Sequence, residues 1–179
     1  MVKKRKVGSA VLLNEEVIAL DCDTSREFWH KSQYGAKRGK GSIVFSHLDT
    51  LFLVSKDKLV VTNQRNQEIP FDALYKKFFR LDKELATRYP VYADFRERGY
   101  VVKTALKFGG DFRVYPKGKT PSEAHAKWIV YPVSEAKMLS WRDFSAKNRV
   151  AHSTKKNLLI GVVDDDGDVS YFEIQWLKP

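Results

Sequence analysis

Cysteine is almost absent from this sequence, since Cys22 is the only one among 179 residues. A single thiol excludes a disulfide within the chain and a zinc site built from several cysteines, and it leads us to expect a reducing compartment. Long apolar runs are missing too, because no stretch approaches the roughly 20 residues that a membrane-spanning helix needs. The opening MVKKRKVG leads into a strand-like pattern instead of the apolar core of a signal peptide. We therefore expect a soluble protein of the cytoplasm.

Negative charge is also scarce. Asp and Glu number 22 against 32 Lys and Arg, which gives a net charge of +10 and a pI near 9.6. This imbalance favours a polyanionic partner, because each cation placed on a phosphate releases condensed counterions. Charge alone does not show that the partner is a nucleic acid, since many basic proteins bind none. An apolar content of 43% is ample for the core of one large domain or two small ones.

The first half of the chain predicts a small α/β domain. Ser25 and Ser46 are each placed to cap a helix, and apolar residues at helical spacing from Phe71 predict a long amphipathic helix. The Lys- and Gly-rich segment 31–41 indicates a loop, for which phosphate contact and a solvated surface are equally open. The expected elements are strands at 10–13, 17–20, 43–45 and 59–62 and helices at 25–30, 46–54 and 71–85.

A second domain is predicted after Pro90, which interrupts the helical pattern ahead of a short helix that stops at Gly99. We place the boundary around 82–90 and divide the chain into 1–85 and 86–179. Strand and helix patterns then mix, which indicates an α+β or mixed α/β fold with a partly antiparallel sheet and flanking helices. Asp166-Gly167 suits a tight hairpin turn. The expected elements are strands at 100–106, 111–115, 128–133, 158–163 and 169–176 and a helix at 139–150.

Three side chains of the second domain can together cleave RNA without a metal. Tyr115 ends a predicted strand, His125 lies in a polar loop, and Lys156 precedes an apolar strand. The 2′-hydroxyl of RNA can attack its own neighbouring phosphate when a base, an acid and a fixed cation are supplied. A phenol is a poor base unless nearby positive charge favours its ionised form, and Lys156 and Arg149 are the candidates. From the residues alone, His125 can be either acid or base.

Several motifs in a fixed order resemble the archaeal tRNA-splicing endonucleases. The block GYVVKTALKFGGDFRVYPKG precedes a histidine ten residues after its last tyrosine, and RVAHSTKK and a terminal WLKP follow. The resemblance is dense from about residue 89 to the end and thinner before it, where QYG at 33–35 and FDALYKKF at 71–78 keep the family's order. It implies that the second domain is the nuclease domain.

This resemblance implies a role for each of the three side chains. Tyr115 would be the general base that removes the 2′-hydroxyl proton, and His125 the general acid that protonates the departing 5′-oxygen. Lys156 would stabilise the pentavalent phosphorane. His152 and Lys155 are the competing residues of the same types, and we expect His152 to pack locally and Lys155 to face water.

The resemblance also implies an RNA contact and an assembly contact. Arg149 matches an arginine that stacks on a bulged base. The family's second stacking arginine has no match here, and the C-terminal strand offers Tyr171, Phe172 and Trp176 instead. The acidic run at 164–168 does not fit the pattern of a calcium-binding loop. In related enzymes, an acidic loop at the same place in the chain inserts into a basic pocket of a neighbouring subunit. The expected interface residues are Asp164, Asp165, Asp166 and Asp168.

The implied activity is excision of introns from precursor tRNA at bulge-helix-bulge junctions, leaving a 2′,3′-cyclic phosphate and a 5′-hydroxyl, with no metal or cofactor. We expect a homotetramer, or a heterotetramer with a paralogous subunit. One alternative is a non-catalytic RNA-binding subunit, which should lack one of the three residues. Another is a metal-dependent DNA nuclease, for which Asp111 and Glu123 form only a weak pattern.

Overall fold

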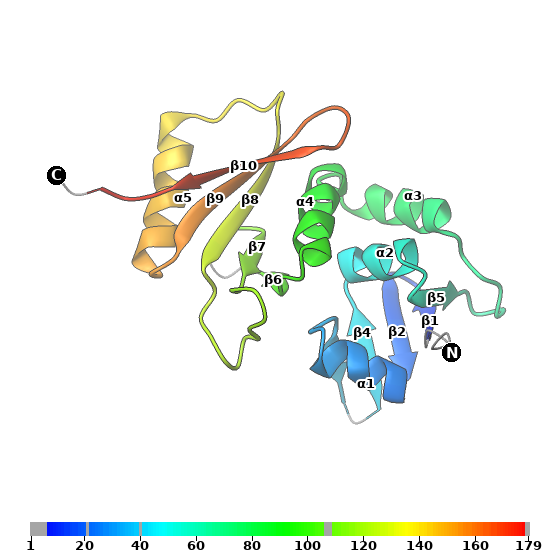
Figure 1. Cartoon of the computed structure of the whole chain (residues 1–179). Helices are drawn as coiled ribbons and strands as arrows, with labels where there is room; N and C mark the ends of the chain where they lie inside the picture. The colour runs from blue at the N-terminus through cyan, green and yellow to red at the C-terminus, as the bar shows by residue number, and fades with distance from the viewer. Residues whose placement is uncertain (1–6, 21, 40, 106–108, 178–179) are drawn as a thin grey trace. The chain divides into compact units, whose positions relative to one another are not determined.

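The structure is a computed structural model that describes residues 7–20, 22–39, 41–105 and 109–177 (Figure 1). The chain divides into two compact units, Met1–Leu85 and Ala86–Pro179. Each unit has its own five-stranded sheet with helices beside it, so the predicted mixture of α and β structure is confirmed. None of the described helices is both long enough and apolar enough to cross a bilayer.

The first unit is organised by a mixed sheet in the order β3-β4-β2-β1-β5. Neighbouring strands are antiparallel except for β1 and β5, which run parallel. The predicted hairpin of β1 and β2 is confirmed, whereas β3 lies inside the segment 31–41, for which we expected only a loop. The strands are β1 (Gly8–Leu13), β2 (Glu16–Leu20), β3 (Ala36–Arg38), β4 (Ser42–Phe45) and β5 (Leu59–Thr62).

Three helices belong to this unit: α1 (Asp23–His30), α2 (His47–Ser55) and α3 (Phe71–Leu81). The predicted cap of α2 is confirmed, since Ser46 Oγ accepts from the backbone N–H of Asp49 at 3.0 Å in a capping box. The predicted cap of α1 is wrong. Cys22 occupies the N-cap, and Ser25 is buried in the first turn of the helix.

The QYG motif holds the loop before β3 against α2. The backbone N–H of Gly35 donates to Asp49 Oδ2 at 3.1 Å. Gly35 has a φ of +69°, and a Cβ there would lie 2.8 Å from both Ile43 Cγ2 and the carbonyl of Val44, so only glycine fits. Tyr34 beside it is buried. This part of the family resemblance therefore reflects packing.

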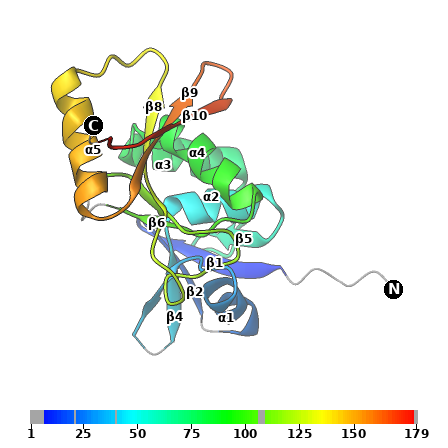
Figure 2. The ribbon, with the colours of Figure 1, turned by 60° about the vertical axis from the view of Figure 1, so that its left-hand side comes forward.

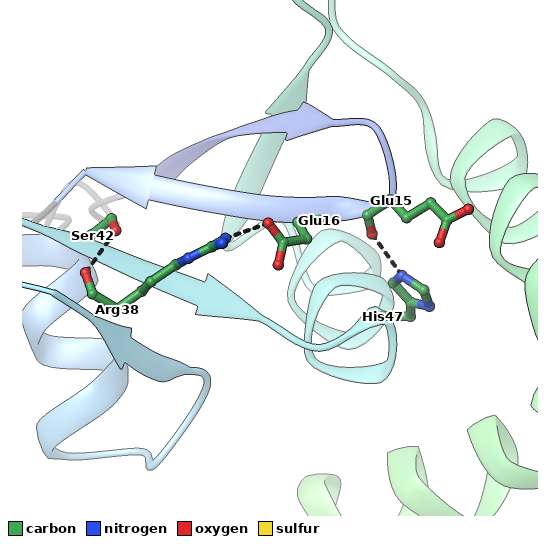
Figure 3. Close-up of polar contacts among 5 residues, drawn as sticks. All are labelled: Glu15, Glu16, Arg38, Ser42 and His47. Carbon is green, nitrogen blue, oxygen red and sulfur yellow. Dashed lines mark hydrogen bonds and ion pairs between the residues drawn. The ribbon is translucent and has the colours of Figure 1, made fainter.

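Polar side chains tie the β1–β2 hairpin to its neighbours (Figure 3). The Nε2–H of His47 donates to the carbonyl of Glu15 at 2.8 Å. Arg38 forms an ion pair with Glu16, and its carbonyl accepts from Ser42 Oγ at 3.0 Å. One cation of the basic segment 31–41 thus has a carboxylate partner within its own domain.

The second unit has a sheet in the order β10-β9-β8-β7-β6. All neighbours are antiparallel except β8 and β9, which run parallel and are joined by the crossover helix α5 (Trp141–Ser153). The predicted strands and final hairpin are confirmed. Three strands are shorter than predicted, whereas β8 and β9 are each one residue longer. Leu106 of the first predicted strand lies outside the described residues. The strands are β6 (Val102–Thr104), β7 (Phe112–Val114), β8 (Trp128–Ser134), β9 (Asn157–Val163) and β10 (Val169–Ile174).

Two helices, α4 (Leu85–Glu97) and α5, pack on this sheet (Figure 1, Figure 2). Gly161 lets α4 come close, since a Cβ there would lie 3.0 Å from Val91 Cγ2. Tyr171 on β10 donates its hydroxyl to Asp94 Oδ2 of α4 at 2.8 Å. Beneath α5 the buried cluster contains Ala105, Ile129, Tyr131, Val133, Ala151, Leu158 and Ile160.

The predicted helix break at Pro90 is wrong. The helix that begins at Phe71 ends at Leu81, and Pro90 lies inside α4. Asp82 makes the break instead, because its backbone is extended and its Oδ1 accepts from the N–H of Glu84 at 3.0 Å. A local side-chain hydrogen bond of this kind competes with helix continuation.

Replacing Tyr171 by Phe should destabilise the second unit. A hydrogen bond to a charged group is worth about 1.5–3 kcal/mol, so the free energy of unfolding should fall by about that amount. Burial and the bond to Asp94 both raise the pKa of Tyr171. The unfolded phenol therefore ionises first, and the advantage of the wild type should shrink as pH rises above about 10. Denaturant unfolding at neutral and alkaline pH measures both effects.

A double-mutant cycle with Asp94→Ala controls for other contacts of the two residues. A coupling energy near zero between positions 94 and 171 would contradict this account of how β10 is held to α4.

Candidate active site

The topology of the second sheet brings the predicted site residues to one end. Because β7 is antiparallel to β8 and β8 is parallel to β9, the last residue of β7 and the first residues of β8 and β9 lie at the same end of the sheet. Val114, Trp128 and Asn157 pair in one row across the three strands. Tyr115 comes directly after β7, and Lys156 comes directly before β9. Neighbouring strands lie roughly 5 Å apart, so these two backbones are about two strand spacings apart.

A turn at the end of α5 separates the two adjacent lysines. Lys155 has a left-handed backbone with a φ of 56°, and its N–H donates to the carbonyl of His152 at 2.9 Å. The N–H of Lys156 donates to the carbonyl of Ala151 at 2.9 Å. This pair of bonds is a Schellman motif. It leaves Lys155 exposed, whereas Lys156 is half-buried with its Nζ donating to the carbonyl of Thr154 at 2.7 Å.

A second cation lies near Lys156. Burial lowers the pKa of Lys156, and the positive charge of Arg113 adds to this effect. Arg113 lies on β7 two residues before Tyr115, so strand alternation puts both on one face. It pairs with Ile129, which belongs to the cluster beneath α5. The Nε–H of Arg113 donates to the carbonyl of Thr104 at 3.0 Å.

The side chain of Tyr115 is enclosed by its neighbours. Its side chain is only 5% exposed and packs in a small cluster with Val101 and Ala126. Its backbone N–H donates to the carbonyl of Val101 at 3.0 Å, which continues the pairing of β6 and β7 by one residue. Packing therefore restricts where the phenol ring can lie.

A capped turn orders the loop that carries His125. Glu123 Oε2 accepts from the backbone N–H of Thr120 at 2.8 Å and from its hydroxyl at 2.9 Å, with Pro121 at the first position of the turn. The two bonds from Thr120, the backbone one first, lower the pKa of Glu123. His125 is exposed two residues later, and the buried Ala126 anchors the chain after it. The imidazole is thus presented to solvent beside the start of β8.

The two carboxylates of the weak metal pattern have local partners. Asp111 pairs with Arg88 Nε at 2.6 Å, and Glu123 holds the turn described above. Within the described ranges, no group of three or more His, Cys, Asp or Glu side chains is arranged to hold a metal ion.

Of the three aromatic residues proposed as partners of Arg149, Trp176 has a ring contact with α5. Arg149 is exposed on that helix. Trp176 stacks on the ring of His152, three residues after Arg149, with centroids 5.1 Å apart and planes at 23°. Tyr171 instead packs against α4, and Phe172 is 58% exposed on β10. The expectation that His152 packs locally is confirmed.

The acidic residues of the β9–β10 turn fall into two groups. Asp164 Oδ1 accepts from the backbone N–H of Asp168 at 2.8 Å and so holds the turn. Gly167 has a positive φ of +87°, whereas Asp166 does not have a positive φ. Asp165, Asp166 and Asp168 are exposed.

Two family models match successive parts of the chain. Residues 8–75 match the N-terminal domain of tRNA intron endonuclease, and residues 85–171 match its catalytic C-terminal domain. The class of protein is therefore an endonuclease with a separate N-terminal domain. The chain belongs to the tRNA intron endonuclease family, as the sequence motifs predicted.

Curated relatives of similar length agree with this assignment. The chain is 33% identical to a tRNA-splicing endonuclease of Pyrococcus abyssi, covering 97% of this chain and 99% of the relative. It is 35% identical to one of Methanococcus vannielii, covering 99% of each. It is 38% identical to one of Nanoarchaeum equitans, covering 74% of this chain and 88% of the relative.

The sequence interpretation missed Arg113. Its signal was present, because a strand-end residue two places before Tyr115 shares its face. The structure adds that the charge of Arg113 acts on Lys156, which the sequence does not show.

Replacing Glu123 by Ala should loosen the loop that carries His125. The amide of Thr120 then loses its acceptor and should exchange on the order of tenfold faster. Glu123→Gln, which keeps an acceptor oxygen, should retain much of the protection. Because the pKa of Glu123 is lowered, its stabilising effect is present above the ordinary glutamate pKa and lost only as pH falls through the lower value. Hydrogen exchange of wild type and variants at matched pH measures this, and equal rates for Thr120 in all three would refute it.

Proposed function

We propose that this chain is the catalytic subunit of a cytoplasmic tRNA-splicing endonuclease, which removes introns from precursor tRNA at bulge-helix-bulge junctions. The observation that carries the proposal is the placement of Tyr115, the His125 loop and Lys156 at one end of one sheet. The names of the relatives support the substrate class.

In the proposed reaction, Tyr115 removes the proton from the 2′-hydroxyl next to the scissile phosphate. The 2′-oxygen forms a bond to phosphorus, and the bond from phosphorus to the 5′-oxygen breaks. His125 gives its proton to that departing oxygen. The products are a 2′,3′-cyclic phosphate and a 5′-hydroxyl, and no water, metal or other cofactor is consumed.

Lys156 contributes by electrostatics. The phosphorane carries one more negative charge than the phosphodiester, so a fixed ammonium stabilises it more than it stabilises the substrate. The turn at Lys155 and the bond to Thr154 hold this ammonium in a half-buried place, where charge interactions are stronger than in bulk water.

Arg149 and Trp176 are the RNA contacts that we propose beside the cleavage site. A guanidinium and an indole can both stack on an unpaired base without reading its identity. The stack of Trp176 on His152 brings the indole to the helix that carries Arg149, so the two groups can flank one bulged nucleotide. An enzyme that recognises RNA by shape needs contacts of this kind.

The proposed assembly is a homotetramer, with a heterotetramer containing a paralogous subunit as the second choice. Two bulges on one substrate require two cleavage centres at a fixed separation. The exposed carboxylates of Asp165, Asp166 and Asp168 suit a basic surface on another copy of a chain with net charge +10. The edge strand β10, with Phe172 58% exposed, offers a second surface for pairing between copies. A non-catalytic role fits less well, because all three reactive residues are present.

The purified chain alone should cleave a bulge-helix-bulge RNA in the presence of EDTA. The released fragments should carry 2′,3′-cyclic phosphate and 5′-hydroxyl ends at both bulges, which mass spectrometry of the products identifies. Activity that depends on added Mg²⁺ would contradict the metal-independent mechanism. Cleavage only after a second subunit is supplied would favour the heterotetramer.

Within the same assay, His125→Ala should abolish detectable cleavage while RNA affinity changes little, because the acid acts only in the chemical step. His30→Ala is the matched control, since His30 is an exposed histidine of the first unit. Turnover by the His125 variant at the wild-type rate would exclude it as the general acid.

Neutralising Asp165, Asp166 and Asp168 together to Asn should weaken the assembly and lower the mass in solution by light scattering. Their carboxylates would no longer meet the cations of another copy. Asp164 is left intact because it holds the turn.

The matched control removes three exposed acidic charges elsewhere, at Asp57, Asp72 and Glu84, and should leave the mass unchanged. An unchanged mass for the loop variant as well would dismiss the proposed interface.

A further inference from the structure

The first unit carries a groove that the proposed reaction does not use. Its volume of about 430 Å³ falls within the range of roughly 300–1,000 Å³ that is usual for small-ligand sites. The lining comes from β1 and the turn after it, from the segment between β5 and α3, and from α3. All of these belong to the first unit, whereas the groups of the proposed reaction belong to the second. The groove is therefore a separate site.

Hydrogen bonds fix the polar turn that follows β5 and forms one wall of the groove. Asn63 Oδ1 accepts from the backbone N–H of Arg65 at 2.8 Å and from that of Gln67 at 3.0 Å. Asn63 Nδ2 donates to Gln67 Oε1 at 2.9 Å, and the backbone N–H of Asn63 donates to the carbonyl of Gln67 at 2.9 Å. The turn thus carries Gln64 and Arg65 on a backbone that needs little further ordering when a ligand binds.

Four polar side chains of the groove are unused within the part of the chain that the structure describes. Arg65 and Lys77 are exposed and have no ion pair or side-chain hydrogen bond with any described residue. The same holds for the amide groups of Asn14 and Gln64. No carboxylate is among the described side chains that line the groove. The groove therefore offers two positive charges and two uncharged hydrogen-bonding groups to a ligand.

These groups match the parts of a nucleotide. A guanidinium and an ammonium both bind phosphate oxygens. A carboxamide has one acceptor oxygen and two N–H donors, so it can pair with the edge of a base. Leu12 and Ile69 give the groove an apolar part, where the flat face of a base can leave water. The edge of a base is free for such contacts where the RNA strand is unpaired.

We propose that this groove binds an unpaired nucleotide of the RNA substrate, with Arg65 and Lys77 on phosphates and the amides of Asn14 and Gln64 on the base. The inference rests on the proposed function only because it takes precursor tRNA as the ligand. The contact adds affinity for the substrate outside the cleavage centre. A free nucleoside monophosphate has the same chemistry, and the acidic loop of another copy is the competing occupant.

The test measures how tightly the full-length chain binds a precursor tRNA with 2′-deoxyribose at both cleavage positions, so that no 2′-hydroxyl can attack there. Fluorescence anisotropy at several salt concentrations gives the slope of log affinity against log salt. For Arg65→Ala combined with Lys77→Ala, the slope should become shallower by about 1.4, or about 0.7 for each lost phosphate contact of a single strand. At about 0.1 M salt the affinity should fall on the order of tenfold.

The matched control combines Lys58→Ala with Arg142→Ala, which removes one lysine and one arginine that are exposed outside the groove. This variant should keep the wild-type slope. An equal change of slope in both double variants would overturn the proposal, because it would mean that RNA is attracted by the net charge of the chain alone.

Gln64→Ala separates a nucleotide site from a merely basic surface. It should lower the affinity about fivefold or more, the scale of one base contact, and leave the salt slope unchanged because a carboxamide carries no charge. Gln64→Ala with the affinity of wild type would overturn the proposed contact with a base. Thermal unfolding of each variant checks that the first unit remains folded.

Two further measurements address the other occupants. Light scattering should give the wild-type mass for Arg65→Ala combined with Lys77→Ala, and a lower mass would assign the groove to contact between copies instead. Calorimetry with each of the four nucleoside monophosphates tests the free ligand. A monophosphate that binds wild type but not the double variant, together with unchanged RNA affinity, would overturn the proposal in favour of the free nucleotide.

Failure of this inference and failure of the proposed function are distinguishable. Tight RNA binding that none of the groove variants changes would refute the groove and leave the proposed function intact. Loss of binding in the groove variants, with no cleavage of an all-ribose precursor by wild type, would refute the proposed function and support the groove. Absence of binding by wild type would refute both.

Discussion

The candidate active site depends on the parallel pairing of β8 and β9 within a sheet that is otherwise antiparallel. A parallel pair needs a crossover, and α5 provides it. The crossover returns the chain to the end of the sheet where β8 starts. Lys156 therefore lies at the same end as Tyr115, which follows β7. If a hairpin had joined β8 to an antiparallel β9, Lys156 would lie at the opposite end of the sheet, where β8 finishes. The catalytic proposal therefore follows from strand direction before any side chain is considered.

Local turns then orient the groups that the sheet brings together. The left-handed residue Lys155 ends α5 and turns the next lysine inward. The bonds between Thr120 and Glu123 order the loop before His125. Groups held in this way need little reorganisation when charge develops on a substrate, which is the main source of electrostatic catalysis.

Patterns with a local cause were predictable from the sequence. Asp166-Gly167 predicted its hairpin, and Ser46 predicted its helix, because turn and cap chemistry act within four residues. Failures came where two local signals competed. Pro90 seemed the stronger breaker, yet the side chain of Asp82 ends the preceding helix and α4 runs through the proline. The segment 31–41 looked like a loop from its composition, whereas pairing with β4 makes part of it a strand.

By itself the sequence determined the family and the order of its two domains, because the motifs that mark them have fixed spacing, and it predicted the residue types of the proposed cleavage centre. It did not decide between neighbouring residues of the same type, because spacing alone cannot distinguish them. Only the tertiary structure placed Trp176 against His152 and Tyr171 against Asp94. Those pairs join residues distant in the chain, and their proximity arises from strand register and helix packing, which no local pattern encodes.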